Sequence, residues 1–189
     1  MTAALGVLAL GAGAAASTAT TAPDPQAATD AKGDVRSALD LTRVSLARGP
    51  DGRLRASLTL ASDWDGADLL SATGSPGSLC LKLWTTAVPP DTTPDQLVCV
   101  TADKEGALRG SILKARPNKL PERIGGASVS RPSRRTVTLR FSQTAIGRPA
   151  LVSAAAEATR PGCRRASCID LAPDAPTTLT LRLRDAKTA

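Results

Sequence analysis

Residues 53–60 read Arg-Leu-Arg-Ala-Ser-Leu-Thr-Leu, a strict alternation of polar and apolar side chains. In an extended chain every second residue, from Leu54 to Leu60, lies on one face, and the polar residues lie on the other. This period of two is typical of a β-strand that is buried on one face only. The segment therefore predicts a half-buried strand.

The same alternation occurs at 136–141 and at 178–184. Other segments show the pattern more weakly, and Ala-rich 150–158 is interpreted as a strand because prolines flank it closely. These weaker segments are 40–47, 78–86, 96–102, 107–114, 126–130 and 150–158. The sequence thus predicts about nine short strands.

Turn-forming residues separate these strands. Residues 48–52 read Arg-Gly-Pro-Asp-Gly, and residues 131–134 place Pro at the second position of a turn, where its fixed φ fits. Strands that alternate in this way are half-buried and belong to antiparallel sheets. We therefore expect an all-β protein, an antiparallel β-sandwich of the jelly-roll or immunoglobulin-like kind, with one domain over 36–186.

Two longer segments lack a strand pattern. Residues 61–77 contain Leu69 and Leu70, which can anchor the segment to the core through one helical turn. Residues 87–95 contain three prolines, so they are expected to protrude from the sheet. Loops of this kind commonly carry the binding function of a β domain.

The N-terminal residues resemble an export signal. Residues 3–16 are an apolar run, and no charge occurs before Asp24, although no Lys or Arg precedes the run. Its length fits a signal peptide and is short for a membrane span; an alanine-rich linker is the alternative. We expect a signal peptide over 1–22, a flexible leader over 23–35, a secreted or cell-envelope location and no membrane span.

The four cysteines are Cys80, Cys99, Cys163 and Cys168, and they permit three disulfide connectivities. A hairpin with Cys80 opposite Cys99 also pairs leucines with valines on the opposite face, and it places Trp84 on the face of the sulfurs. We therefore expect structural disulfides Cys80–Cys99 and Cys163–Cys168. A zinc site with the four cysteines as ligands is the alternative, but the paired Cys-x-x-Cys spacing that zinc sites prefer is absent.

Catalytic patterns are scarce. The chain has no His, which excludes every triad, relay or metal site that needs an imidazole, and it has no Ser-x-x-Lys motif or phosphate-binding glycine motif. Any two acids can converge as glycosidase carboxylates, but the chain offers few aromatic rings to line a sugar cleft. We expect a protein that is not an enzyme.

Acidic residues gather before two of the strands. Asp30 and Asp34 precede the strand at 40–47 and Asp40 begins it, and Asp170 and Asp174 precede the strand at 178–184. If the terminal strands are neighbours, these loops meet and can bind calcium, a hard cation that takes six to eight oxygen ligands. The alternative is that these residues cap turns in solvent.

The segment from Asp30 to Leu46 resembles the start of secreted β-sandwich modules related to family 9 carbohydrate-binding and DOMON-like domains. In those modules a Gly-Asp loop leads to an Asp–hydrophobic pair that begins the first strand. The resemblance implies a sandwich, often with a structural calcium, and sometimes sugar binding between aromatic rings. It carries over only Asp34 and Asp40, as calcium ligands. The chain departs from these modules in having few aromatic rings; Trp64 and Trp84, the only large rings outside the expected core, are the candidate ligand-binding aromatics.

The formal net charge is +7, and many arginines occupy outward positions of the expected strands. The candidate ligand-binding arginines are Arg53, Arg55, Arg140, Arg182 and Arg184. If their strands are neighbours, the resulting basic face would attract an extracellular acidic glycan or another polyanion, whereas a solvated Arg-rich surface is the alternative. The scarcity of stacking aromatics argues against nucleic acid as the partner.

These observations lead to one functional hypothesis and one alternative. The hypothesis is a secreted, non-catalytic β-sandwich domain with a binding or structural role at the cell envelope. The alternative is a calcium-stabilised module that binds carbohydrate or a polyanion.

Overall fold

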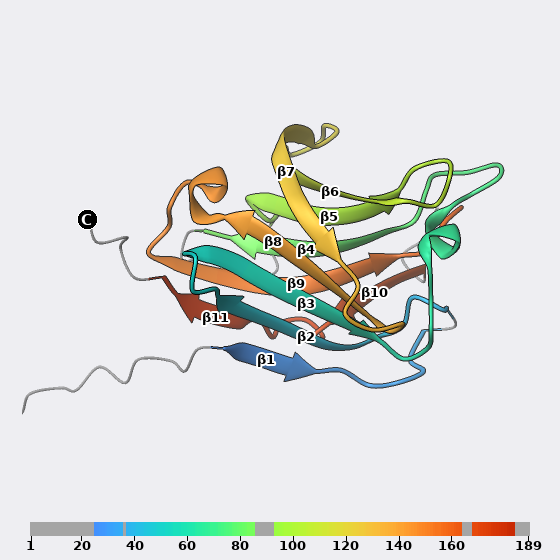
Figure 1. Ribbon diagram of the computed structural model, residues 1–189, viewed down its shortest axis with the longest axis horizontal. Helices are drawn as coiled ribbons and strands as arrows, with labels where there is room; N and C mark the ends of the chain where they lie inside the picture. The colour runs from blue at the N-terminus through green and yellow to red at the C-terminus, as the bar shows by residue number, and fades with distance from the viewer. Residues whose placement is uncertain (1–24, 36, 86–92, 164–167, 184–189) are drawn as a thin grey trace, which may run out of the picture.

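A computed structural model describes residues 25–35, 37–85, 93–163 and 168–183. The expected signal peptide at 1–22 lies outside these residues. Apart from two short 3-10 helices, all the regular secondary structure of the described residues is β-strand (Figure 1). The strands are β1 (Gln26–Thr29), β2 (Leu41–Arg48), β3 (Arg53–Leu60), β4 (Ser78–Trp84), β5 (Gln96–Ala102), β6 (Leu108–Lys114), β7 (Glu122–Ser130), β8 (Thr136–Ser142), β9 (Leu151–Thr159), β10 (Ile169–Ala172) and β11 (Leu179–Arg182).

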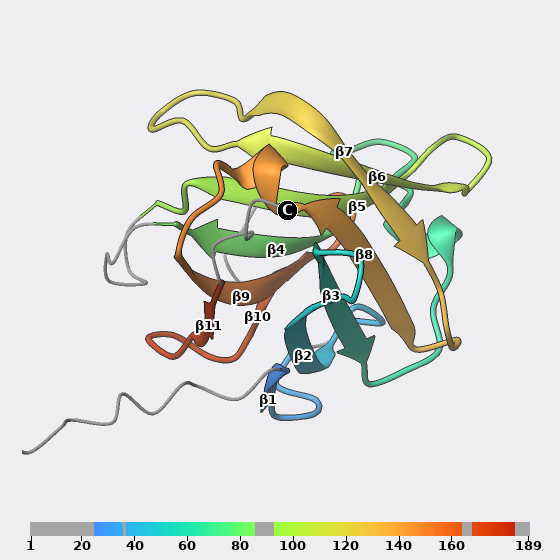
Figure 2. The same ribbon diagram turned by 60° about the vertical axis from the view of Figure 1, so that its left-hand side comes forward.

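The eleven strands form one antiparallel sheet in the order β1-β2-β3-β8-β7-β6-β5-β4-β9-β10, with β11 also paired to β9. This sheet curls into a nearly barrel-shaped body (Figure 2). The expected all-β antiparallel class is confirmed. The expected two-layer sandwich of about nine strands is not confirmed, because the sheet continues through β7 from one half to the other.

Strand β7 makes this continuity possible. Its first half pairs with β6 and its second half pairs with β8, so it belongs to both halves of the sheet. A register shift between Ile112 and Leu113 lies opposite β7, close to the adjacent glycines Gly125 and Gly126. Bulges and glycines let a strand bend sharply. The sheet therefore curls at this point instead of dividing into two layers.

All nine strands expected from the sequence are present, with ends that differ by up to four residues. Two strands are additional, β1 and β10, and each has only four residues. Strand β1 pairs with β2 and lies within 23–35, the segment that we expected to be a flexible leader. The paired sheet thus includes residues that show no clear alternation in the sequence.

The core fills the inside of the curled sheet. On β3 the alternate residues from Leu54 to Leu60 are buried, as the period of two predicts, and on β8 the same holds for Val137, Leu139 and Phe141. The segment 61–77 is anchored by a short 3-10 helix, η1 (Gly66–Leu69), whose Leu69 is buried. A second, η2 (Gln143–Ile146), follows β8. Neither of these described helices is long or apolar enough to cross a membrane.

Both expected disulfides are present. Cys80 lies directly opposite Cys99 on neighbouring strands, with their Cα atoms 4.0 Å apart, and the second bridge joins Cys163 to Cys168. The flanking pairs place Leu81 opposite Val98 in the core, which is the expected register. Two disulfides are typical of proteins from an oxidising, extracellular compartment.

The two ends of the sheet approach each other along a seam. Strands β10 and β11 contact β2, and β11 also contacts β1, although no backbone ladder joins them to these strands. Instead, the side chain of Asp170 on β10 accepts a hydrogen bond from the backbone N–H of Leu41 on β2. The expected meeting of the two acidic segments occurs at this seam.

Candidate metal centre

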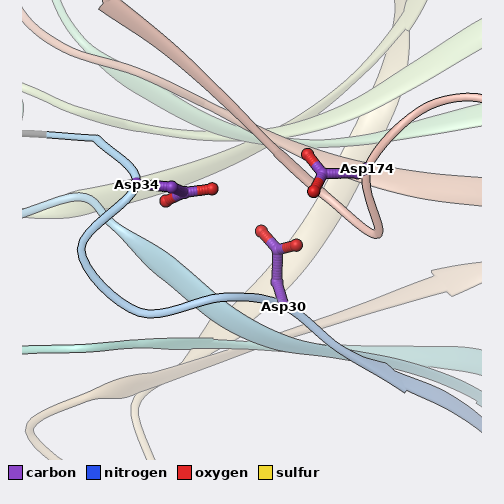
Figure 3. Close-up of side chains that lie close together, drawn as sticks. All are labelled: Asp30, Asp34 and Asp174. Carbon is purple, nitrogen blue, oxygen red and sulfur yellow. The ribbon is translucent and has the colours of Figure 1, made fainter.

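Five aspartates meet at the seam, and each comes from a segment fixed by a strand. Asp30 follows β1, Asp40 precedes β2, and Asp34 lies in the loop between them; Asp170 belongs to β10, and Asp174 follows it. One carboxylate oxygen from each of Asp30, Asp34 and Asp174 lies within 4.8 Å of the others. The three carboxylates point toward one another (Figure 3).

A second group shares Asp34 with the first. One oxygen from each of Asp34, Asp40 and Asp170 also lies within 4.8 Å of the others. Asp40 and Asp170 are buried, with exposed fractions of 5% and 4%. The two groups together form a continuous acidic cluster that runs from the solvent-facing side of the seam into the protein.

Each of the two buried carboxylates has one backbone partner. Asp170 accepts the N–H of Leu41, and Asp40 accepts the N–H of Gly33 through Oδ2 at 2.8 Å. Gly33 has a φ of 84°, a left-handed conformation that glycine adopts without strain, and this turn brings its N–H back to Asp40. The loop between β1 and β2 is therefore folded round the cluster.

Two oxygens of the cluster lack partners among the described residues. Asp40 Oδ1 and Asp30 Oδ2 are both buried and accept no hydrogen bond. A buried carboxylate oxygen without a donor loses its hydration and gains nothing in exchange, which is energetically unfavourable. Asp40 and Asp30 each belong to a group of side chains whose carboxylates lie close enough to share one cation.

The electrostatics of the cluster disfavour negative charge. Burial raises the pKa of Asp30 from 3.8 to about 6, and repulsion from Asp174 and Asp34 adds to the effect. Burial also raises the pKa of Asp170 to about 6, against the opposing effect of the hydrogen bond from Leu41. Among the described residues no Lys or Arg forms an ion pair with any of the five carboxylates.

A hollow of about 790 Å³ gives solvent access to the outer part of the cluster. It lies beside β1 and is lined by Asp30, Asp174, Arg43 and Pro173, among others. The five aspartates supply only oxygen ligands, some exposed and some buried. This donor set suits a hard cation such as calcium, and it does not suit zinc, which prefers sulfur and nitrogen.

The four aspartates predicted as calcium ligands, Asp34, Asp40, Asp170 and Asp174, are brought together by the structure. Asp30 joins them; the sequence places it in the same acidic group, but not among the predicted ligands. The signal that could have identified it is its position four residues before Asp34, within the same acidic segment.

The two candidate ligand-binding tryptophans are both buried. Trp64 is 4% exposed and Trp84 is 2% exposed. Trp64 belongs to the main core, and the Arg131 guanidinium lies 4.7 Å from its ring centroid. On the outer side of β4, the Lys82 ammonium lies 5.9 Å from the ring centroid of Trp84. Neither ring therefore offers a free face on which a sugar can stack.

The predicted arginines do not form a single group. Arg53 and Arg55 on β3 and Arg140 on β8 lie on the outward face of neighbouring strands, and all three are exposed. Arg182 lies on β11, which pairs with β9 in the other half of the sheet. Arg184 lies outside the described residues.

Comparisons of this chain with protein-family models, with curated proteins and with solved structures find no match.

Proposed function

We propose that this protein is a secreted, non-catalytic β domain with a binding or structural role at the cell envelope, and that calcium bound by the acidic cluster stabilises it. The two disulfides support a location in an oxidising compartment. The absence of His from the whole sequence supports a role without imidazole-dependent catalysis.

The observation that carries the calcium proposal is the side chain of Asp40. It is 5% exposed, its Oδ1 has no hydrogen-bond donor among the described residues, and it lies within reach of two further carboxylates. A bound cation would supply the missing partner and would offset the repulsion between the carboxylates. Calcium fits better than magnesium because it accepts many oxygen ligands in flexible arrangements.

Calcium at this position would act on the fold. Its ligands come from the β1–β2 segment on one side of the seam and from β10 and the following residues on the other. A cation held between them would link the two ends of the sheet. Binding to the folded state alone raises the free energy of unfolding. The resemblance of residues 30–46 to calcium-containing β-sandwich modules points to the same role for Asp34 and Asp40.

The test is the melting temperature of the full chain, measured by differential scanning calorimetry in excess EDTA and in excess calcium. Calcium at about 100 times its Kd adds about 2.7 kcal/mol, which corresponds to roughly 5–10 °C for a domain of this size. The variant Asp40→Asn should fold and should lose most of this increase. The control Glu105→Gln removes the same charge at an exposed position and should retain it.

Two results would contradict the proposal. An unchanged melting temperature of the wild-type protein on addition of calcium would remove calcium as a stabilising ligand. An equal calcium effect in Asp40→Asn and in the wild-type protein would show that calcium binds elsewhere.

A further inference from the structure

A second charged feature lies on the outward face of β3 and β8, away from the core. Arg55 on β3 and Arg140 on β8 are directly opposite each other in the ladder, and both are exposed. In the same row, Ala47 on β2 flanks Arg55, and Ser128 on β7 flanks Arg140. We call Arg53, Arg55 and Arg140, with Ala47 and Ser128, the arginine face.

The pairing of Arg55 with Arg140 is unfavourable for the fold alone. Side chains directly opposite on an antiparallel pair lie about 5 Å apart at Cβ, and like charges there repel. Among the described residues neither guanidinium forms an ion pair, and no outward position of β2, β3 or β8 carries an acid. The third arginine of the face differs, because Arg53 lies 4.0 Å from Asp51 in the β2–β3 turn.

The residues round the two arginines are small. Ala47 and Ser128 lie beside them, and in the neighbouring row the hydroxyl of Ser57 is hydrogen-bonded to that of Thr138 at 3.0 Å. No aromatic side chain occupies an outward position on β2, β3 or β8. The guanidinium groups of the face therefore project from a surface of small side chains.

The face continues into a hollow of about 500 Å³ at one end. Arg53 lies opposite Ser142 in the β3–β8 ladder, and both line this hollow together with Arg148, Gln143 and one acid, Asp51. Positive side chains thus extend from the middle of two strands into an open depression. An extended ligand would meet several of them in sequence, whereas a single small anion would meet one or two.

We propose that the arginine face binds an acidic polysaccharide, a linear glycan that carries carboxylate or sulfate groups. Arginine binds planar oxyanions through two parallel hydrogen bonds, and an anionic ligand would neutralise the repulsion between Arg55 and Arg140. The absence of aromatic platforms on the face disfavours single-stranded nucleic acid, which binds by base stacking. This inference rests on the proposed binding role, but it does not depend on calcium.

The experiment is a titration of the full chain with fluorescently labelled heparin, which carries sulfates, and polygalacturonate, which carries carboxylates. Fluorescence anisotropy in EDTA at about 50 and 200 mM NaCl gives the affinity and its salt dependence. Labelled oligo-dT is the third ligand. The test variant is R55Q/R140Q, and the matched control is R109Q/R123Q, which removes two exposed arginines from β6 and β7 outside the face.

We expect at least one glycan to bind, more tightly than oligo-dT and more weakly at the higher salt concentration. R55Q/R140Q should bind it about tenfold more weakly, whereas the control should stay within about twofold of the wild-type protein. The melting temperature of R55Q/R140Q should equal or exceed that of the wild-type protein, because the like-charge pair is gone. This second measurement separates lost binding from lost folding.

Three results would overturn the inference. They are no binding of either glycan, an equal loss of affinity in both double variants, and tighter binding of oligo-dT than of the glycans. The first would also remove the support for a glycan-binding role. Because the titration is done in EDTA, its outcome is independent of the calcium test, and either proposal can fail while the other stands.

Discussion

Substitutions of Asp170 can separate two effects on stability, that of the hydrogen bond which its carboxylate accepts and that of its negative charge. Its carboxylate accepts the backbone N–H of Leu41 across the seam, and it lies among other carboxylates with no ion-pair partner in the described part of the chain. Asn at this position retains an acceptor oxygen and removes the charge. Ala removes both. The comparison of Asp170→Asn with Asp170→Ala therefore measures the hydrogen bond at constant charge.

The structure sets the size of each effect. Leu41 is fully buried, and loss of the acceptor leaves its N–H unsatisfied, which costs about 1–3 kcal/mol. The rise in the pKa of Asp170, from 3.8 to about 6, means that ionisation is less favourable in the fold than in the unfolded chain. That rise corresponds to about 3 kcal/mol at most, and solvent screening at the partly open cluster reduces it to about 1 kcal/mol.

The assay is urea unfolding at pH 7, followed by tryptophan fluorescence, in EDTA and in calcium. In EDTA we expect Asp170→Asn to gain about 1 kcal/mol over the wild-type protein and Asp170→Ala to be about 2 kcal/mol less stable than Asp170→Asn. In calcium the wild-type protein should gain more than either variant. Equal stability of the two variants in EDTA would refute the role of the hydrogen bond, and a loss in Asp170→Asn would refute the unfavourable charge.

Two further predictions concern pH and the disulfides. In EDTA, the raised pKa values of Asp30 and Asp170 contribute stability that is fully present below pH 3.8 and is lost as the pH rises toward about 6. The variant D30N/D170N lacks these titrations, so its free energy of unfolding, measured by urea titration, should rise relative to that of the wild-type protein across this interval. A constant difference would contradict the reasoning. Removal of the first bridge in C80A/C99A should lower the free energy of unfolding by about 3 kcal/mol, because this bridge joins residues with a sequence separation of 19. The second bridge has a sequence separation of only 5, so C163A/C168A should lower the free energy of unfolding by less, as measured by calorimetry. The reverse order would contradict the loop-closure explanation.

The sequence predicts most strands because side-chain alternation is a local signal. Residues 53–60 and 136–141 show it plainly, and the structure buries the expected face of each. Strands β1 and β10 have only four residues each. Strand β11 is just as short, but β1 and β10 lack its apolar inward face: in β10 the buried residues are Asp170 and Ala172, and Ile169 is exposed. Strands β1 and β10 form by pairing with β2 and β9, their neighbours along the chain, and such pairing leaves no mark on the side-chain alternation of one segment.

The curl of the sheet also could not be predicted from the alternation of side chains. Two separate layers and one continuous curled sheet require the same alternation, and they differ only in whether a strand passes from one half to the other. Here β7 does so, at Gly125 and Gly126. A pair of glycines within a strand indicates a bend or a bulge, but it does not say which strands lie on either side.

The candidate site was likewise predictable from the sequence only in part. The meeting of Asp34 and Asp40 with Asp170 and Asp174 could be predicted because acids cluster in two short segments and the terminal parts of β domains are often neighbours. The burial of Trp64 and Trp84 could not. Trp84 lies on the outer side of β4, where alternation predicts exposure, yet it is buried. Packing on the outer side of a sheet depends on segments that are remote in sequence.

The seam explains why a cation would have an effect at this place rather than at another acidic surface. Elsewhere in the described sheet, each neighbouring pair of strands is joined by a ladder of backbone hydrogen bonds, and an added ion would change little. Between β2 and β10, the bond from Leu41 N–H to Asp170 stands in place of a ladder. Repulsion among the carboxylates acts directly on this weak closure, and it pushes the two ends of the sheet apart. A cation that reverses the sign of this interaction would cross-link the two ends of the sheet where no backbone ladder joins them.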